Sequence, residues 1–203
     1  MQPNWVPVGV DFSPSSTGVV LGHTSGHLLY EVVVWPPNPD GVRKSWRERR
    51  AAAYLVADSI DARAGDTGGV PFVVLEDYAP GRWAGTSHIE IAESRGYLLE
   101  QFVSRGWPFV LIHPMRLKGF IKAKTKAESV AKAKELMATT GCPSLPEGLT
   151  PRQQGDLCDA FVLWRIGTMV LFSNSSLPDS WVSGDSALGL PRNSYYEPFL
   201  RED

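Results

Sequence analysis

Cysteine is scarce in this sequence, since only Cys142 and Cys158 occur among 203 residues. Neither forms a Cys-x-x-Cys pair or a cysteine–histidine arrangement with the spacing of zinc ligands. This scarcity indicates neither a disulfide framework nor a structural zinc site. We therefore expect both thiols to be buried in the protein interior.

Long apolar runs are absent as well. No segment supplies the roughly 18 uninterrupted apolar residues that mark a candidate membrane-spanning helix. Residues 1–12 also lack the basic stretch, apolar stretch and small-residue cleavage site of a secretory signal. These absences predict a cytoplasmic protein with no membrane partner.

A large excess of one charge is missing too, because 20 Lys and Arg residues against 22 Asp and Glu residues give a formal net charge of -2. This balance argues against a protein that binds any polyanion. The basic residues are nevertheless concentrated at 43–50 and at 116–134. Such a distribution is compatible with a basic face around an acidic pocket.

Hydrophobic patterning predicts one α/β domain, a mixed five-stranded sheet with helices on its faces. We predict strands at 6–12, 17–21, 27–35, 70–76 and 107–113. We predict helices at 42–63, 88–105, 126–139 and 151–172. The domain would comprise residues 1–172, and residues 173–203, rich in Ser, Pro, Asn and Gly, would form an extension or tail.

Two of the predicted helices carry apolar stripes. The stripe of helix 42–63 is Trp46, Ala53, Val56 and Ile60. The stripe of helix 88–105 is Ile91, Leu98, Leu99 and Phe102. Because periodicity shows only that a face is buried, the second stripe fits core packing and a dimer contact equally well.

Two acidic residues end predicted strands, Asp11 at the end of 6–12 and Glu76 at the end of 70–76. In open α/β sheets, ligands usually lie at the carboxyl ends of the strands. If these two strands are neighbours, the carboxylates lie side by side, which is costly unless a cation is bound or one acid is protonated.

Two further acids, Asp156 and Asp159, lie three residues apart and therefore on one face of helix 151–172, near its start. The helix dipole also favours acids at a helix start, and this alternative explains either residue alone. All four acids together predict a site of hard oxygen ligands for Mg²⁺ or Mn²⁺. Two such ions are suited to phosphodiester cleavage.

Four segments of the sequence resemble the motifs of RuvC-type Holliday-junction resolvases, which are RNase H-like proteins. They are VGVDFSPSSTGVVL at 8–21, VVLEDYAP at 73–80, ESRGYLLEQF at 93–102 and GDLCDAFVLWRIG at 155–167. The ordered matches span residues 6–170. The divergence and the added tail suggest a phage-type relative, acting in a bacterium or a phage-infected host.

The resemblance implies an RNase H-like fold and a homodimer that makes paired nicks across a four-way DNA junction. It also implies that each active site binds two Mg²⁺ ions, with Mn²⁺ as a possible substitute. The metal ligands that it implies are Asp11, Glu76, Asp156 and Asp159.

The basic segment that follows residue 114 resembles the family's region of lysines near the scissile phosphate. Lys118 and Lys126 match those lysines best and are candidate catalytic residues. Further candidate DNA contacts in this segment are Arg116, Lys122 and Lys124. A solvated basic helix is the alternative interpretation, and His113 is interpreted as a strand-end residue rather than a general base.

The loop after Glu76 offers aromatic and basic side chains where resolvases of this type approach the junction. Tyr78 or Trp83 could stack on a base and Arg82 could hold a phosphate. Packing at the base of the loop is the alternative for Trp83.

Two other functions remain open. The sequence from Asp11 to Gly18 also resembles the phosphate loop of actin-like ATPases, although this chain is short for their two related domains. A non-catalytic protein that binds branched DNA on the same fold is the other alternative.

Overall fold

The computed structural model describes residues 4–13, 16–23, 27–34, 44–77 and 86–172. Its strands are β1 (Trp5–Phe12), β2 (Ser16–Leu21), β3 (Leu29–Val34), β4 (Val70–Glu76) and β5 (Phe109–Ile112). Its helices are α1 (Trp46–Asp66), α2 (Thr86–Ser104), α3 (Pro114–Phe120), α4 (Lys126–Thr139) and α5 (Pro151–Phe172).

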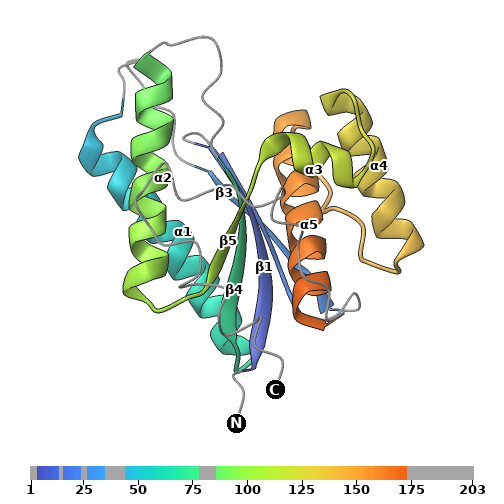
Figure 1. Cartoon of the computed structure of the whole chain (residues 1–203), viewed down its shortest axis with the longest axis horizontal. Coiled ribbons are helices and arrows are strands. Elements are labelled where there is room, and N and C mark those ends of the chain that lie inside the picture. Colours follow the sequence, from blue (N-terminus) through green and yellow to red (C-terminus); the bar gives the residue numbers. More distant parts are fainter. Residues whose placement is uncertain (1–3, 14–15, 24–26, 35–43, 78–85, 173–203) are drawn as a thin grey trace.

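The strands form one mixed sheet in the order β3-β2-β1-β4-β5. β1, β2 and β3 are joined by antiparallel pairing, whereas β4 is parallel to both β1 and β5. Helices α1 and α2 cover one face of the sheet, and α3, α4 and α5 lie on the other side (Figure 1). The predicted mixed five-stranded α/β fold is confirmed.

The alternation of residues along β1 divides the core into two layers. Val8 and Val10 pack toward α1 and α2, in the same cluster as Leu98, Leu99 and Phe102 of α2. Each fully buried Leu or Phe contributes about 1.5–3 kcal/mol to stability. Leu98, Leu99 and Phe102 are therefore part of the hydrophobic core of the chain.

Three sequence predictions about the helices need correction. Trp46, expected on the buried stripe of α1, is 50% exposed; it is the first residue of the helix, whose buried residues begin at Ala52. The short helix α3 was not predicted, although Pro114 at its start is a typical signal; its N-cap is His113, whose side chain accepts from the backbone N–H of Met115. Ile91 of the α2 stripe is only half-buried.

Helix α5 lies directly on the sheet because two strand residues lack side chains. A Cβ atom on Gly9 of β1 would lie 2.0 Å from the carbonyl oxygen of Ala160. A Cβ atom on Gly18 of β2 would lie 2.4 Å from the carbonyl oxygen of Asp156. The two glycines thus let the first half of α5 lie directly against β1 and β2.

The expectations from scarce cysteine and missing apolar runs can be compared with the structure. Cys142 and Cys158 are both buried and free, as predicted. Among the helices within the described ranges, none combines the length and the apolar character that crossing a membrane requires.

Candidate metal centre

Asp11 and Glu76 lie side by side at the carboxyl ends of two neighbouring strands. The parallel register pairs Val10 of β1 with Leu75 of β4, so the next residue of each strand is an acid. Asp11 also pairs with Gly18 of β2, on whose face α5 packs. The expected pairing of the two acids is confirmed, and both belong to the α5 side of the sheet.

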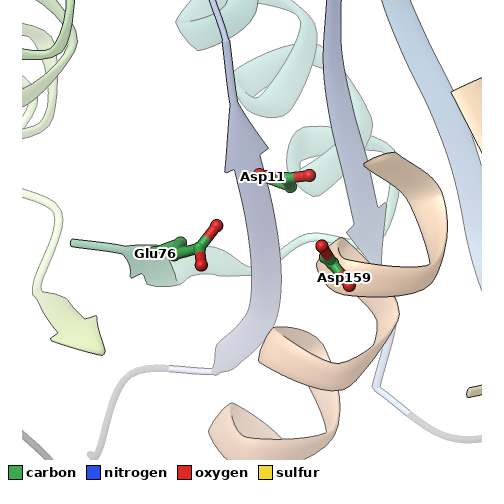
Figure 2. A group of neighbouring side chains, drawn as sticks. All are labelled: Asp11, Glu76 and Asp159. Carbon is green, nitrogen blue, oxygen red and sulfur yellow. The ribbon is translucent and has the colours of Figure 1, made fainter. Parts of the chain in front are cut away.

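Asp159 of α5 completes a group of three carboxylates. One oxygen from each of Asp11, Glu76 and Asp159 lies within 4.8 Å of the others. Figure 2 shows the three side chains converging from β1, β4 and α5. Residues from both ends and the middle of the domain therefore build one acidic site.

Asp156 is close to this site but differs from the other acids in its partner. Its side chain is buried, and its Oδ2 atom accepts a hydrogen bond from the Ser16 hydroxyl. Asp156 is not part of the three-acid group, yet its charge helps to raise the pKa of Asp11. The carboxylate thus lies at the rim of the cluster.

The helix dipole does not account for the two α5 acids. Helix α5 begins at Pro151, and its first turn contains no acidic residue. The influence of the dipole is largely confined to that turn. This sequence-based alternative is therefore wrong for Asp156 and Asp159.

Asp159 is held by two side chains from the start of α4. Lys126 forms an ion pair with its Oδ2 atom. The Ser129 hydroxyl donates a hydrogen bond to its Oδ1 atom at 3.2 Å. Both oxygens of this carboxylate are consequently engaged by α4.

The electrostatics of the cluster favour an added cation. Burial, followed by the charges of Glu76 and Asp159, raises the pKa of Asp11 well above its usual value. Burial and Asp159 also raise the pKa of Glu76 to about 7, although Lys126 partly offsets both effects. Crowded, buried carboxylates of this kind either keep protons or bind a cation.

The two predicted catalytic lysines both lie at the cluster. Lys118 of α3 is near enough to Glu76 to lower the pKa of that acid. Burial alone would lower the pKa of Lys126, but Asp159, Asp11 and Glu76 outweigh burial and raise it. Lys126 therefore stays charged beside the acids.

The remaining predicted contacts are only partly described. Arg116, Lys122 and Lys124 are exposed around α3 and the start of α4. Lys122 has a left-handed backbone, with φ of 53°, and its carbonyl accepts a hydrogen bond from Lys132.

Tyr78, Arg82, Trp83 and residues 173–203 lie outside the described residues. His113 caps α3 through Nδ1, which agrees with a structural role.

Sequence reasoning missed Ser16 and Ser129, the two buried hydroxyls that hold the α5 acids. Ser129 follows Lys126 by three residues, so helical spacing alone places both on one face of α4. Ser16 had no comparable signal, because its partner is 140 positions away in the chain.

The donor set fits a hard divalent cation. All three converging side chains offer oxygen, and among the described residues no cysteine or histidine joins the group. Mg²⁺ and Mn²⁺ prefer carboxylate and water oxygens. The residues present are therefore suitable ligands for either ion.

A mixed five-stranded sheet with acids at the ends of β1 and β4 and on the helix that covers them is the arrangement expected from the resemblance to RNase H-like proteins. No protein-family model and no curated protein sequence matches the chain. Solved structures do match, and all those named below are under 25% identical to it.

The chain is similar to RuvC of Thermus thermophilus, both in complex with a Holliday junction substrate and in a second structure. The complex shares 18% identity and a TM-score of 0.55, over 81% of this chain and 98% of RuvC. The second structure gives 18% and 0.55, over 80% and 97%. The yeast mitochondrial Holliday junction resolvase Ydc2 shares 11% identity and a TM-score of 0.51, over 82% of both chains. The fold is therefore that of the RuvC-like resolvases.

Proposed function

We propose that this protein is a metal-dependent endonuclease that resolves Holliday junctions and related branched DNA by paired phosphodiester hydrolysis. The observation that carries the proposal is the convergence of Asp11, Glu76 and Asp159 within 4.8 Å at one edge of the sheet. The similar RuvC structure contains a Holliday junction substrate, which supports DNA of that shape as the substrate here.

In this proposal the acids bind two Mg²⁺ ions, or Mn²⁺ ions. When bound, such ions supply activation of water and stabilisation of the leaving oxygen. Asp11, Glu76, Asp156 and Asp159 would hold the ions, the first, second and last as the converging group and Asp156 from beside it. The chain itself thereby fixes where the attacked phosphate must lie.

Lysines beside the acids would position that phosphate. The ammonium groups of Lys118 and Lys126 are close enough to the acids to change their pKa values. A cation at this place stabilises the charge that develops on the phosphate in the transition state. We assign these two lysines to catalysis on that basis.

Contacts farther from the acids would supply affinity for the DNA. Arg116, Lys122 and Lys124 are exposed near the cluster, and cations of this kind bind backbone phosphates. We assign Tyr78 and Trp83 to base stacking and Arg82 to phosphate binding from the sequence alone.

Paired nicks on opposing strands require two active sites, so we propose a homodimer that acts in the cytoplasm. Residues 1–172 would be the nuclease domain and 173–203 an extension. The products would carry 5′-phosphate and 3′-hydroxyl ends.

The packing of Gly18 favours a nuclease over an actin-like ATPase. The glycine of the Thr-Gly pair is required by the backbone of α5, whose Asp156 oxygen would be 2.4 Å from an added Cβ. No nucleotide phosphate is needed to account for this residue.

Strand-specific cleavage mapping tests the proposal. A labelled four-way junction and a linear duplex of the same sequence are each incubated with Mg²⁺ or Mn²⁺, and nicks are mapped on all strands. We expect symmetrical nicks in opposing arms of the junction only, and none with Asp11→Asn protein that still binds the junction. Full cleavage by purified Asp11→Asn protein would reject the metal assignment. Junction binding without any cleavage by the wild type would favour the non-catalytic binder.

A further inference from the structure

Lys126 occupies the acid cluster as a cation of the protein itself. Its ammonium forms an ion pair with Oδ2 of Asp159, and the charges of Asp11 and Glu76 also act on it. The acids of the proposed metal centre therefore have a positive partner from within the chain.

The contact leaves Lys126 free to move away. The Lys126 side chain is 56% exposed, whereas that of Asp159 is only 10% exposed. The ammonium thus approaches a buried carboxylate from the solvent side. Its long, flexible stem can turn outward without disturbing the core.

The first turns of α5 provide a path for this side chain. Gly155 lies one helical turn before Asp159, and a Cβ atom there would be 3.1 Å from Cε of Lys126. Glycine inside a helix costs about 1 kcal/mol relative to alanine, so its presence calls for a reason. The passage of Lys126 over this position supplies one.

Ser129 holds Asp159 independently of Lys126. Its buried hydroxyl donates to Oδ1, while Lys126 contacts Oδ2. If the ammonium leaves, Ser129 still orients the carboxylate. Oδ2 is then exposed to the neighbouring acids and to an incoming ion.

We propose that the Lys126 ammonium is a resident cation of the acid cluster, which a divalent ion displaces from Asp159 and which then turns to the phosphate of the DNA. This inference rests on the proposed metal centre. The resident cation keeps the buried acids together before the ion binds. The same charge competes with that ion, because the two cations would repel each other within the cluster.

Calorimetric titration with Mn²⁺, without DNA and at fixed pH and salt, tests the competition. Lys126→Met keeps the length of the side chain and removes its charge, so we expect Mn²⁺ to bind about tenfold more tightly. Lys134→Met is the matched control, since Lys134 lies on the same helix and contacts Gln154 of α5 instead of an acid. It should leave the affinity unchanged. Unchanged or weaker binding by Lys126→Met would overturn the proposal.

Two further variants extend the test. Lys126→Gln also removes the charge and keeps a polar side chain, so tighter binding is expected again, and this variant decides alone if Lys126→Met does not fold. Ser129→Ala should weaken binding about tenfold, as losses of groups that orient metal ligands commonly do. Unchanged affinity in Lys126→Gln and Ser129→Ala would contradict the proposed arrangement.

Cleavage separates this inference from the proposed function. Lys126→Met should bind the ion more tightly yet cleave the junction more slowly, because the phosphate loses its cation. If the wild type binds Mn²⁺ and cleaves but Lys126→Met shows no gain in affinity, only the inference fails. If the wild type binds no Mn²⁺ at all, both the proposed metal centre and this inference are wrong.

Discussion

Ser16 donates a hydrogen bond to the carboxylate of Asp156, and the bond joins the start of β2 to the second turn of α5. Both side chains are buried. The bond engages one oxygen of Asp156 and keeps that acid apart from the three that converge. Asp156 and Asp159, equivalent in the sequence motif, are therefore unequal in the folded protein.

This inequality predicts different effects of removing each charge. Asp159→Asn should weaken the binding of Mn²⁺ more than Asp156→Asn, because only Asp159 belongs to the converging group. An amide at position 156 can still accept from Ser16, so the fold should persist. Calorimetric titration of both variants with Mn²⁺ shows which of them loses more affinity. Equal losses of affinity would show that Asp156 is as much a ligand as Asp159.

The glycines beneath α5 predict a second effect. In Gly18→Ala the new methyl group would meet the Asp156 backbone at 2.4 Å, and such overpacking typically costs about 1–3 kcal/mol. Because the displaced segment carries Asp156, the affinity for Mn²⁺ should fall as well. Urea unfolding and metal titration measure the two losses.

Gly65→Ala is the control for this substitution. Gly65 lies in α1 with no atom of the described residues near its Cβ position, so alanine should leave stability unchanged or raise it by up to about 1 kcal/mol. A Gly18→Ala protein as stable as the wild type would mean that α5 does not need this close approach.

The sequence predicted the fold well because most elements carry strong local signals. β4, α4 and α5 begin and end at the predicted residues, since apolar periodicity and terminal residues such as Pro151 mark them. Helix α3 has seven residues, too few for a periodic pattern to appear. Pro114 at its first position was not enough to predict it, because the N-cap residue His113 is not one of the residue types preferred there.

The candidate site was predictable in its acids but not in the groups that hold them. Asp11 and Glu76 end strands, a position that the chain order reveals. The pairing of Ser16 with Asp156 depends on how closely α5 approaches β2, and that distance follows from three-dimensional packing. The spacing of residues along the sequence does not predict how closely α5 approaches β2.

The raised pKa of Glu76 predicts an unusual dependence of stability on pH. Its pKa is about 7 in the folded protein and near 4.5 when unfolded, so the folded state holds an extra proton between these values. The contribution of Glu76 to the free energy of unfolding is therefore complete below pH 4.5 and is lost as the pH rises through 7. Without metal, the wild type should therefore lose stability relative to Glu76→Gln over this range.

Thermal unfolding of both proteins from pH 4.5 to 7.5 measures the difference. Saturating Mn²⁺ should restore the stability of the wild type near pH 7.5, because bound metal favours the ionised carboxylate. It should have little effect on the stability of Glu76→Gln. Parallel pH profiles of the two metal-free proteins would contradict a raised pKa at Glu76.

A buried ion pair beside the cluster predicts the last effect. Arg95 of α2 pairs with Asp77, the residue after Glu76, and their side chains are 7% and 11% exposed. The backbone N–H of Asp77 also donates to Ile112 of β5 at 2.7 Å. The pair therefore anchors the end of β4 from the face opposite α5.

Removing one partner leaves a buried charge uncompensated, which typically costs about 3–5 kcal/mol. Arg95→Met should lose stability on this scale and bind Mn²⁺ more weakly, because Glu76 immediately precedes the freed residue. The double variant Arg95→Met/Asp77→Asn should recover part of both losses, since the stranded charge is gone. Arg50→Met is the control, because its pair with Glu100 is 40% and 50% exposed and such pairs contribute about 1 kcal/mol or less. If Arg95→Met and Arg50→Met cost the same, the buried pair does not anchor β4, and the position of Glu76 must depend on the strand pairing alone.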